Sequence, residues 1–182
     1  MSTVETVKLA HREFGGPEGG EPVVLLHGLL GSSRNWQGLA RILAETHQVT
    51  ALDLRNHGSS PHHPIMDYPS MAADVRAWLD GRTVHLVGHS MGGKVAMQLA
   101  CETPVCIRSL TVVDIAPRAY PARWQREFAA MRRMPVERLA SRAEAAAWLE
   151  EDIPDWAFRK FLVTNLERSN RPRSRWLINL AI

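Results

Sequence analysis

The chain has 182 residues, of which 45% are hydrophobic and 23% are charged, with 22 Lys and Arg against 19 Asp and Glu and a formal net charge of +3. This is the composition of a globular protein with one sizeable core, and it excludes a disordered tail or a disulfide-stabilised mini-protein. No apolar run approaches the roughly 18 residues of a membrane span, and residues 1–16 carry charges where a signal peptide is apolar, so we expect a cytoplasmic protein.

The first part of the chain alternates apolar runs with helical patterns. Short runs rich in β-branched residues predict buried strands at 22–27, 48–53, 84–87 and 109–113. Between them, apolar residues recur at helical spacing and predict helices at 35–45, 70–80 and 92–101. We expect Asn35 to cap the first of these helices through its side-chain oxygen. Strands that alternate with crossover helices form a mostly parallel α/β sheet, with the active site at the carboxyl ends of the strands.

The chain changes character near Pro117. Residues 1–117 hold 9 basic and 11 acidic side chains, whereas residues 118–182 hold 13 and 8. The later part shows helical patterns and no clear strand, with helices expected at 123–134, 142–150 and 154–166 and a polar loop at 167–175. We therefore divide the chain into a core part, 1–117, and a helical cap segment, 118–182.

Two groups of side chains in the cap segment have a functional and a plain interpretation. Five arginines could face an acidic ligand or form a solvated helix face, and helical spacing favours the solvated face, so we expect no nucleic-acid partner; they are Arg118, Arg123, Arg126, Arg132 and Arg133. Six large apolar residues could roof an acyl pocket or pack between helices; they are Trp124, Phe128, Met131, Trp148, Trp156 and Phe161.

The segment Gly88-His89-Ser90-Met91-Gly92 fits the pattern G-x-S-x-G, with a predicted strand directly before it and a predicted helix directly after it. A turn this sharp holds a nucleophilic serine in a strained conformation above the sheet, and Gly88 and Gly92 let neighbouring backbone approach. The alternative is a glycine-rich turn with a serine helix cap. The segment alone does not decide between them.

A second segment, His27-Gly28-Leu29-Leu30-Gly31, also follows a predicted buried strand. Such a loop can bring the backbone N–H of Leu29 opposite that of Met91. Two amides in this arrangement form an oxyanion hole, and each donor is worth roughly 3 kcal/mol in other enzymes. We therefore favour the nucleophile interpretation of Ser90, with Gly28 as the loop glycine.

These motifs, together with Asp53-Leu-Arg-Asn-His-Gly-Ser-Ser60, resemble those of serine hydrolases of the α/β-hydrolase fold. The segments Asn35-Trp36, Val113-Asp-Ile-Ala-Pro117 and Phe161-Leu-Val-Thr-Asn-Leu166 resemble the narrower group of α/β-hydrolase domain-containing protein eleven and small bacterial esterases. The resemblance covers almost the whole chain. It implies hydrolysis of short-to-medium acyl esters or thioesters through an acyl-enzyme on Ser90. We expect no cofactor and no metal.

The third member of such a site is an acid, and the resemblance assigns it to Asp114, at the end of a predicted strand. Other branches of the fold carry the acid one strand later, so a later residue stays an alternative. A strand-exit cap is the plain alternative for Asp114. We expect Asp53 to have a structural role in a hydrogen-bonded turn. The histidine base of this fold follows the acid in the chain, but all eight histidines precede Ser90; they are His11, His27, His47, His57, His62, His63, His85 and His89.

No catalytic histidine is therefore predicted in these 182 residues. The resemblance implies two further strand-helix units after the cap segment, so we expect the chain to end before the remaining core strands. Two interpretations stay open: an active serine esterase or thioesterase, or a catalytically weak or inactive form that acts as a binding or regulatory protein. The oligomeric state is not predicted.

Overall fold

The structure is a computed structural model that describes residues 5–121, 124–167 and 175–181. It divides into two compact units, Met1–Arg118 and Ala119–Ile182. The division lies next to Pro117, where the charge balance of the sequence changes.

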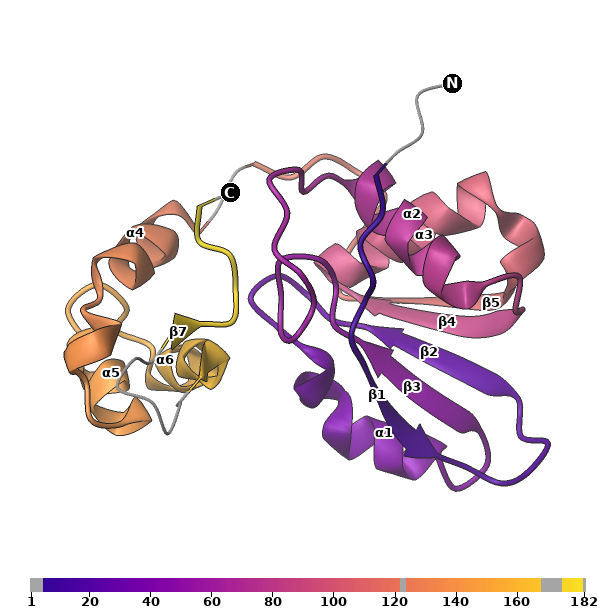
Figure 1. The fold of residues 1–182 in the computed structure, drawn as a ribbon, viewed down its shortest axis with the longest axis horizontal. Coiled ribbons are helices and arrows are strands. Elements are labelled where there is room, and N and C mark those ends of the chain that lie inside the picture. Colours follow the sequence, from indigo (N-terminus) through magenta and orange to yellow (C-terminus); the bar gives the residue numbers. More distant parts are fainter. Residues whose placement is uncertain (1–4, 122–123, 168–174, 182) are drawn as a thin grey trace. The chain divides into compact units, whose positions relative to one another are not determined.

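The first unit is built on a five-stranded sheet (Figure 1). Its strands are β1 (His11–Gly15), β2 (Pro22–Leu26), β3 (Gln48–Leu52), β4 (Val84–His89) and β5 (Ile107–Val113), in the order β1-β3-β2-β4-β5. Only β1 is antiparallel to its neighbour; β2, β3, β4 and β5 run parallel, as the sequence predicts. Leu26 pairs with both Leu52 and Gly88, so the carboxyl ends of three strands are level and their loops leave from one edge.

Helices cover both faces of this sheet, with α1 (Gln37–Leu43) on one face and α2 (Tyr68–Leu79) and α3 (Met91–Glu102) on the other (Figure 1). Because successive side chains of a strand point to opposite faces, Val23 and Leu25 pack toward Ala40 of α1, while Val24 and Leu26 join the core beneath α2 and α3. Burial on both faces explains why β2 is apolar throughout. Two short 3-10 helices complete the unit, η1 (Ser33–Trp36) and η2 (Pro104–Cys106).

Two details of the first unit differ from expectation. Strand β1 was not predicted, because its residues are mostly exposed and backbone hydrogen bonds to β3 hold it at the sheet edge without an apolar pattern. The expected role of Asn35 was also wrong. Its Oδ1 accepts the Ser32 amide at 2.6 Å, as the second half of a capping box at the start of η1.

The second unit contains three short helices, α4 (Gln125–Arg133), α5 (Arg142–Trp148) and α6 (Trp156–Leu162), and two 3-10 helices, η3 (Val136–Arg138) and η4 (Val163–Asn165). The three predicted helices are confirmed, although Arg123 lies outside the described residues and residues 163–165 are 3-10. The expectation of no strand was wrong, because β6 (Leu166–Glu167) pairs with β7 (Arg175–Trp176). A two-residue strand is too short to leave a period-2 pattern, and of the predicted loop 167–175, residues 168–174 lie outside the description.

Candidate functional site

Ser90 stands at the turn between β4 and α3, with backbone angles φ 50° and ψ −115°. Positive φ is uncommon and costly for a residue with a side chain, and it persists only where surrounding contacts enforce it. Here the Ser90 amide donates to the Val113 carbonyl at 2.9 Å, at the end of β5. The sequence predicts this strained turn, and the structure confirms it.

The glycines of this turn allow backbone groups to touch. A Cβ at Gly88 would lie 2.4 Å from the Gly92 carbonyl oxygen, and a Cβ at Gly92 would lie 2.5 Å from the carbonyl oxygens of Leu26 and His27. These atoms belong to the backbone, which cannot move aside as a flexible side chain can. The expected clearance by Gly88 and Gly92 is therefore confirmed.

The loop after β2, residues 27–31, reaches the same place. A Cβ at Gly28 would lie 3.3 Å from Ser90 Cβ and 2.9 Å from His89 Nδ1. The next residue, Leu29, is half-buried, and Met91 begins α3. Among the described residues, no acceptor is recorded for the backbone N–H of Leu29 or of Met91. Both amides can therefore donate to a ligand, and the positive end of the α3 dipole lies beside Met91.

Asp114 follows β5 directly and is brought to the same edge by the hydrogen bond between Ser90 and Val113. Its backbone φ is 55° and its side chain is 86% exposed. His89 Nε2 lies 3.9 Å from Asp114 Oδ2. The ring of His89 thus lies between the Gly28 loop and Asp114. In the described chain, no hydrogen bond to the Ser90 hydroxyl is recorded.

Two of the other histidines, His27 and His57, are completely buried below this edge. Burial disfavours the charged imidazolium, and it lowers the pKa of His57 to about 3. Burial also lowers the pKa of His27. Both rings are therefore neutral near pH 7, and their contacts are with backbone groups.

Asp53 has the structural role expected from the sequence. Its Oδ1 accepts the Ser33 amide at 2.6 Å and its Oδ2 accepts the Ser59 amide at 2.8 Å. A Cβ at Gly58 would meet this carboxylate at 2.3 Å, so the loop is folded tightly around it. Asp53 therefore holds two loops together.

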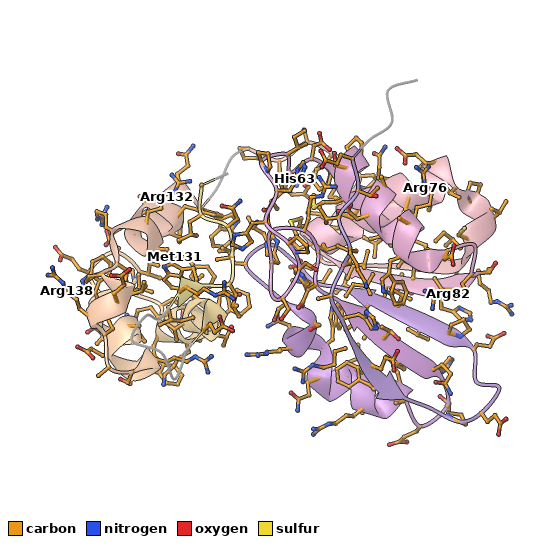
Figure 2. The ribbon with its side chains drawn as sticks, in the orientation of Figure 1. His63, Arg76, Arg82, Met131, Arg132 and Arg138 are labelled. Atoms are coloured by element: carbon orange, nitrogen blue, oxygen red, sulfur yellow. The ribbon has the colours of Figure 1, made fainter. Side chains whose placement is uncertain are left out.

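In the second unit, Arg138 extends outward (Figure 2). Several of the five arginines expected on a solvated helix face bond to other groups of the same unit. Arg133 Nη2 lies 2.7 Å from Asp152 Oδ2, and Arg126 Nη2 donates to the Glu151 carbonyl at 3.1 Å. Arg132 Nε donates to the Leu180 carbonyl. These contacts favour an ordinary helix surface over an acidic-ligand site.

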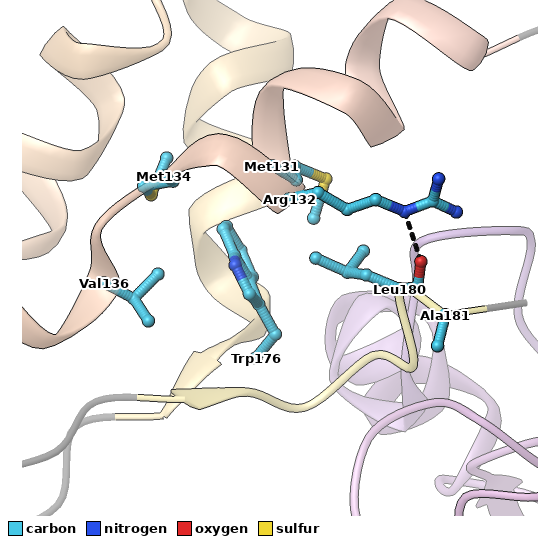
Figure 3. Close-up of a pocket in the computed structure, with 7 residues that line it drawn as sticks. All are labelled: Met131, Arg132, Met134, Val136, Trp176, Leu180 and Ala181. Atoms are coloured by element: carbon cyan, nitrogen blue, oxygen red, sulfur yellow. Dashed lines mark hydrogen bonds between the residues drawn. The ribbon is translucent and has the colours of Figure 1, made fainter.

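The second unit also has an open apolar pocket of about 370 Å³ (Figure 3). It is lined by Met131, Arg132, Met134, Val136, Trp176, Leu180 and Ala181. Of the six apolar residues considered for an acyl pocket, Met131 alone lines it. Trp124 instead packs against Phe158 with ring centroids 5.1 Å apart, and Phe158 stacks with Phe161 at 6.0 Å. Packing between helices explains these aromatic residues.

The described residues contain no group of three or more His, Cys, Asp and Glu side chains arranged to hold a metal ion. They also contain no helix with the length and apolarity needed to cross a membrane.

Comparison with known proteins gives concordant matches. The alpha/beta hydrolase fold family matches residues 21–165. The chain is 38% identical over 187 residues to the sn-1-specific diacylglycerol lipase ABHD11 of Xenopus tropicalis, covering 97% of this chain and 58% of the lipase. It is 39% identical over 146 residues to esterase YbfF of Escherichia coli strain K12, covering 78% of this chain and 58% of that esterase.

Among solved structures, a marine microorganism esterase superposes with a TM-score of 0.90 at 36% identity, covering 96% of this chain and 70% of the esterase. The chain spans about three fifths of the length of the curated relatives it matches.

Proposed function

This chain belongs to the alpha/beta hydrolase fold family, and within that family we propose that it is a carboxylic ester hydrolase that forms an acyl-enzyme on Ser90. The observation that carries the proposal is the conformation of Ser90, a non-glycine residue held at φ 50° between β4 and α3. Glycines on both sides make this turn possible, and a serine cap on a helix does not require such strain.

In the proposed reaction, Ser90 Oγ attacks the carbonyl carbon of an ester, and the negative charge develops on the carbonyl oxygen. The N–H groups of Leu29 and Met91 donate to that oxygen, and the N-terminal end of α3 adds a favourable dipole. The proton of the Ser90 hydroxyl passes to solvent water. As the tetrahedral intermediate collapses, the bond to the leaving oxygen breaks, and that oxygen takes up a proton from water and departs as the alcohol. Water then attacks the acyl-Ser90 ester, which releases the carboxylic acid and restores the Ser90 hydroxyl.

We propose Asp114 as the acid of this site because it lies beside the turn at Ser90. It follows directly after Val113, whose carbonyl accepts the Ser90 amide. An acid acts here by orienting and stabilising a charged base. We assign none of the eight histidines to the role of base. His27 and His57 use both ring nitrogens on backbone groups, and His89 faces Asp114.

The proposed substrates are small esters or thioesters with short-to-medium acyl chains. The names of the relatives, a diacylglycerol lipase and an esterase, support an oxygen ester as the first substrate to try. Acyl transfer from a thioester uses the same nucleophile and the same oxyanion donors, so paired ester and thioester substrates measure the preference for the leaving atom.

The test is covalent labelling of the full chain with a fluorophosphonate probe, followed by mass spectrometry of the labelled peptide. We expect the label on Ser90, its loss in Ser90→Ala, and its retention in Ser109→Ala, which changes an exposed serine on β5. Turnover of p-nitrophenyl acetate and butyrate should depend on Ser90 in the same way. A folded chain whose Ser90 stays unlabelled would contradict the proposal and would favour a binding or regulatory role.

A further inference from the structure

Two loops meet beneath the candidate oxyanion hole, and each contributes one buried histidine. His27 belongs to the loop of residues 27–31, and His57 belongs to the loop of residues 53–60. Their side chains are 1% and 0% exposed, and their ring centroids lie 5.0 Å apart. Neither ring has a recorded contact with Ser90, so the proposed chemistry leaves both histidines without a role.

The two rings exchange hydrogen bonds between the loops. The Leu54 amide donates to His27 Nε2 at 3.0 Å, and the Leu30 amide donates to His57 Nε2 at 3.3 Å. Each histidine thus accepts a backbone N–H from the loop that holds the other histidine. We call these two histidines and their hydrogen bonds the histidine brace.

The opposite nitrogen of each ring bonds to the histidine's own loop. Because Nε2 accepts in both rings, Nδ1 carries the proton. His27 Nδ1–H donates to the Gly28 carbonyl at 2.8 Å, and His57 Nδ1–H donates to the Arg55 carbonyl at 2.9 Å. Both nitrogens of both rings are therefore used. A protonated ring could no longer accept an amide, and burial keeps both rings neutral.

The bond to Gly28 bears on the oxyanion hole directly. The Gly28 carbonyl and the Leu29 N–H belong to one planar peptide group, in which they point in opposite directions. The Gly28 carbonyl is held by His27 Nδ1–H at 2.8 Å and by the Gly31 amide at 3.0 Å. Fixing this carbonyl prevents a flip of the peptide, so the Leu29 N–H stays on the opposite side.

The bond to Leu30 fixes the other side of Leu29. Leu30 has a φ of 62°, in the left-handed region that a leucine rarely adopts. Its N–H shares a planar peptide group with the Leu29 carbonyl, and this N–H is held by His57. Both peptide groups that flank the Leu29 Cα are therefore anchored by the brace.

We propose that His27 and His57 are positioning residues that aim the Leu29 amide at the carbonyl oxygen of the substrate. This inference rests on the proposed function, because it gives the Leu29 amide a reacting oxygen to stabilise. It predicts that removal of either anchor lowers the rate of reaction at Ser90 and leaves substrate binding largely unchanged.

The variants separate the hydrogen bonds from the volume of the ring. His27→Leu removes the donor to Gly28, whereas His27→Asn keeps an N–H donor near the position of Nδ1. His57→Leu removes the acceptor for Leu30, whereas His57→Gln can present a carbonyl oxygen near the position of Nε2. The matched control is His85→Leu, which changes a partly buried histidine that bonds to Glu21 and Ser109, away from both loops.

The first measurement is the rate of fluorophosphonate labelling of Ser90, together with kcat and KM for p-nitrophenyl butyrate. Circular dichroism verifies that each variant is folded under the assay conditions. We expect each leucine variant to lower the labelling rate and kcat by about 10- to 100-fold with little change in KM. Asn at 27 and Gln at 57 should recover most of that loss, and His85→Leu should stay near the wild-type rate. Equal loss in the leucine and amide variants, or wild-type rates in folded leucine variants, would overturn the inference.

The second measurement does not depend on activity. Amide hydrogen exchange followed by NMR should be faster at Leu30 in His57→Leu than in wild type, and near wild type in His57→Gln. If Ser90 does not react in the wild-type chain, the proposed function fails, and unchanged exchange at Leu30 would separately refute the brace. If His57→Leu does not fold, His57→Asn, whose shorter amide does not reach Leu30, replaces it in the comparison with His57→Gln.

Discussion

Gly88 faces the carbonyl group of Gly92 so closely that a Cβ at position 88 would lie 2.4 Å from the Gly92 oxygen. We predict that Gly88→Ala destabilises the protein by more than about 2 kcal/mol, because the clash is with backbone and the core on both sides of β4 resists movement. Urea unfolding followed by circular dichroism measures the loss.

Gly38 provides the matched control for this substitution. It lies within α1, and nothing stands within 4 Å of a Cβ built there. Gly38→Ala should stabilise the protein by about 0.5–1 kcal/mol, because alanine loses less backbone entropy in a helix. Equal changes in the free energy of unfolding for Gly88→Ala and Gly38→Ala would show that the turn before Ser90 tolerates a side chain at position 88.

The buried ion pair of Arg55 and Asp74 should matter more to stability than any surface pair. Both side chains are 0% exposed, and Arg55 donates to Asp74 through Nε at 2.6 Å and Nη2 at 2.8 Å. Arg55→Met would leave the Asp74 carboxylate buried without its counter-charge, so we predict a loss of about 3–5 kcal/mol.

The control for the buried pair is Arg133→Met, which removes an exposed partner of Asp152. Its expected cost is below about 1 kcal/mol, because solvent screens the pair. Thermal or urea unfolding of the two variants gives the comparison. A similar small cost for both variants would mean that Asp74 is adequately satisfied by other donors, of which the Val7 amide is one.

The free energy of unfolding should decrease as the pH is lowered, because the folded chain buries two neutral histidines. The pKa of His57 is about 3 in the folded state against an ordinary 6.5, and burial also lowers the pKa of His27. Between about pH 6.5 and 3 the unfolded chain binds a proton at His57 that the folded chain does not, so the free energy of unfolding decreases as the pH falls through this range. The lowered pKa of His27 acts in the same direction below about pH 6.5, and above that pH neither histidine destabilises the folded chain.

The expected slope is up to about 1.4 kcal/mol per pH unit for each histidine. Urea unfolding at about pH 7, 6 and 5 measures it above the range where most carboxylates titrate. His57→Gln should reduce the slope, because glutamine does not titrate. The same slope in wild type and variant would contradict the assignment of the acid sensitivity to His57.

The sequence was informative where a motif and its neighbours agreed. The apolar run before Gly88 and the helical pattern after Met91 together predicted the strained turn at Ser90, which needs a strand, a glycine and a helix in that order. By contrast, β1 carries no apolar pattern because it is an exposed edge strand, so nothing in its side chains distinguished it from a loop.

The histidine brace was not predictable for a different physical reason. Its hydrogen bonds join residues 27 positions apart, and its donors are backbone amides, which have no signature in the sequence. In the sequence, His27 and His57 are only two of eight histidines that precede Ser90. Their reciprocal bonding is visible only once β2 and β3 lie in register and bring the two loops together.

Substitution of Asp114 tests whether its carboxylate takes part in the reaction at Ser90 or has only a structural role after β5. Its side chain is 86% exposed and its φ is 55°, a conformation that asparagine adopts readily. Asp114→Asn should therefore change the free energy of unfolding by less than about 0.5 kcal/mol. If the carboxylate is the acid of the site, the same variant should lower the labelling rate of Ser90 by at least about 10-fold, because it removes the charge and keeps the shape.

The companion variant is His89→Gln, which removes a ring that lies beside this carboxylate. A lower labelling rate in His89→Gln but not in Asp114→Asn would assign the effect to His89. A labelling rate that is unchanged in Asp114→Asn would instead make Asp114 a strand-exit residue without a part in the chemistry.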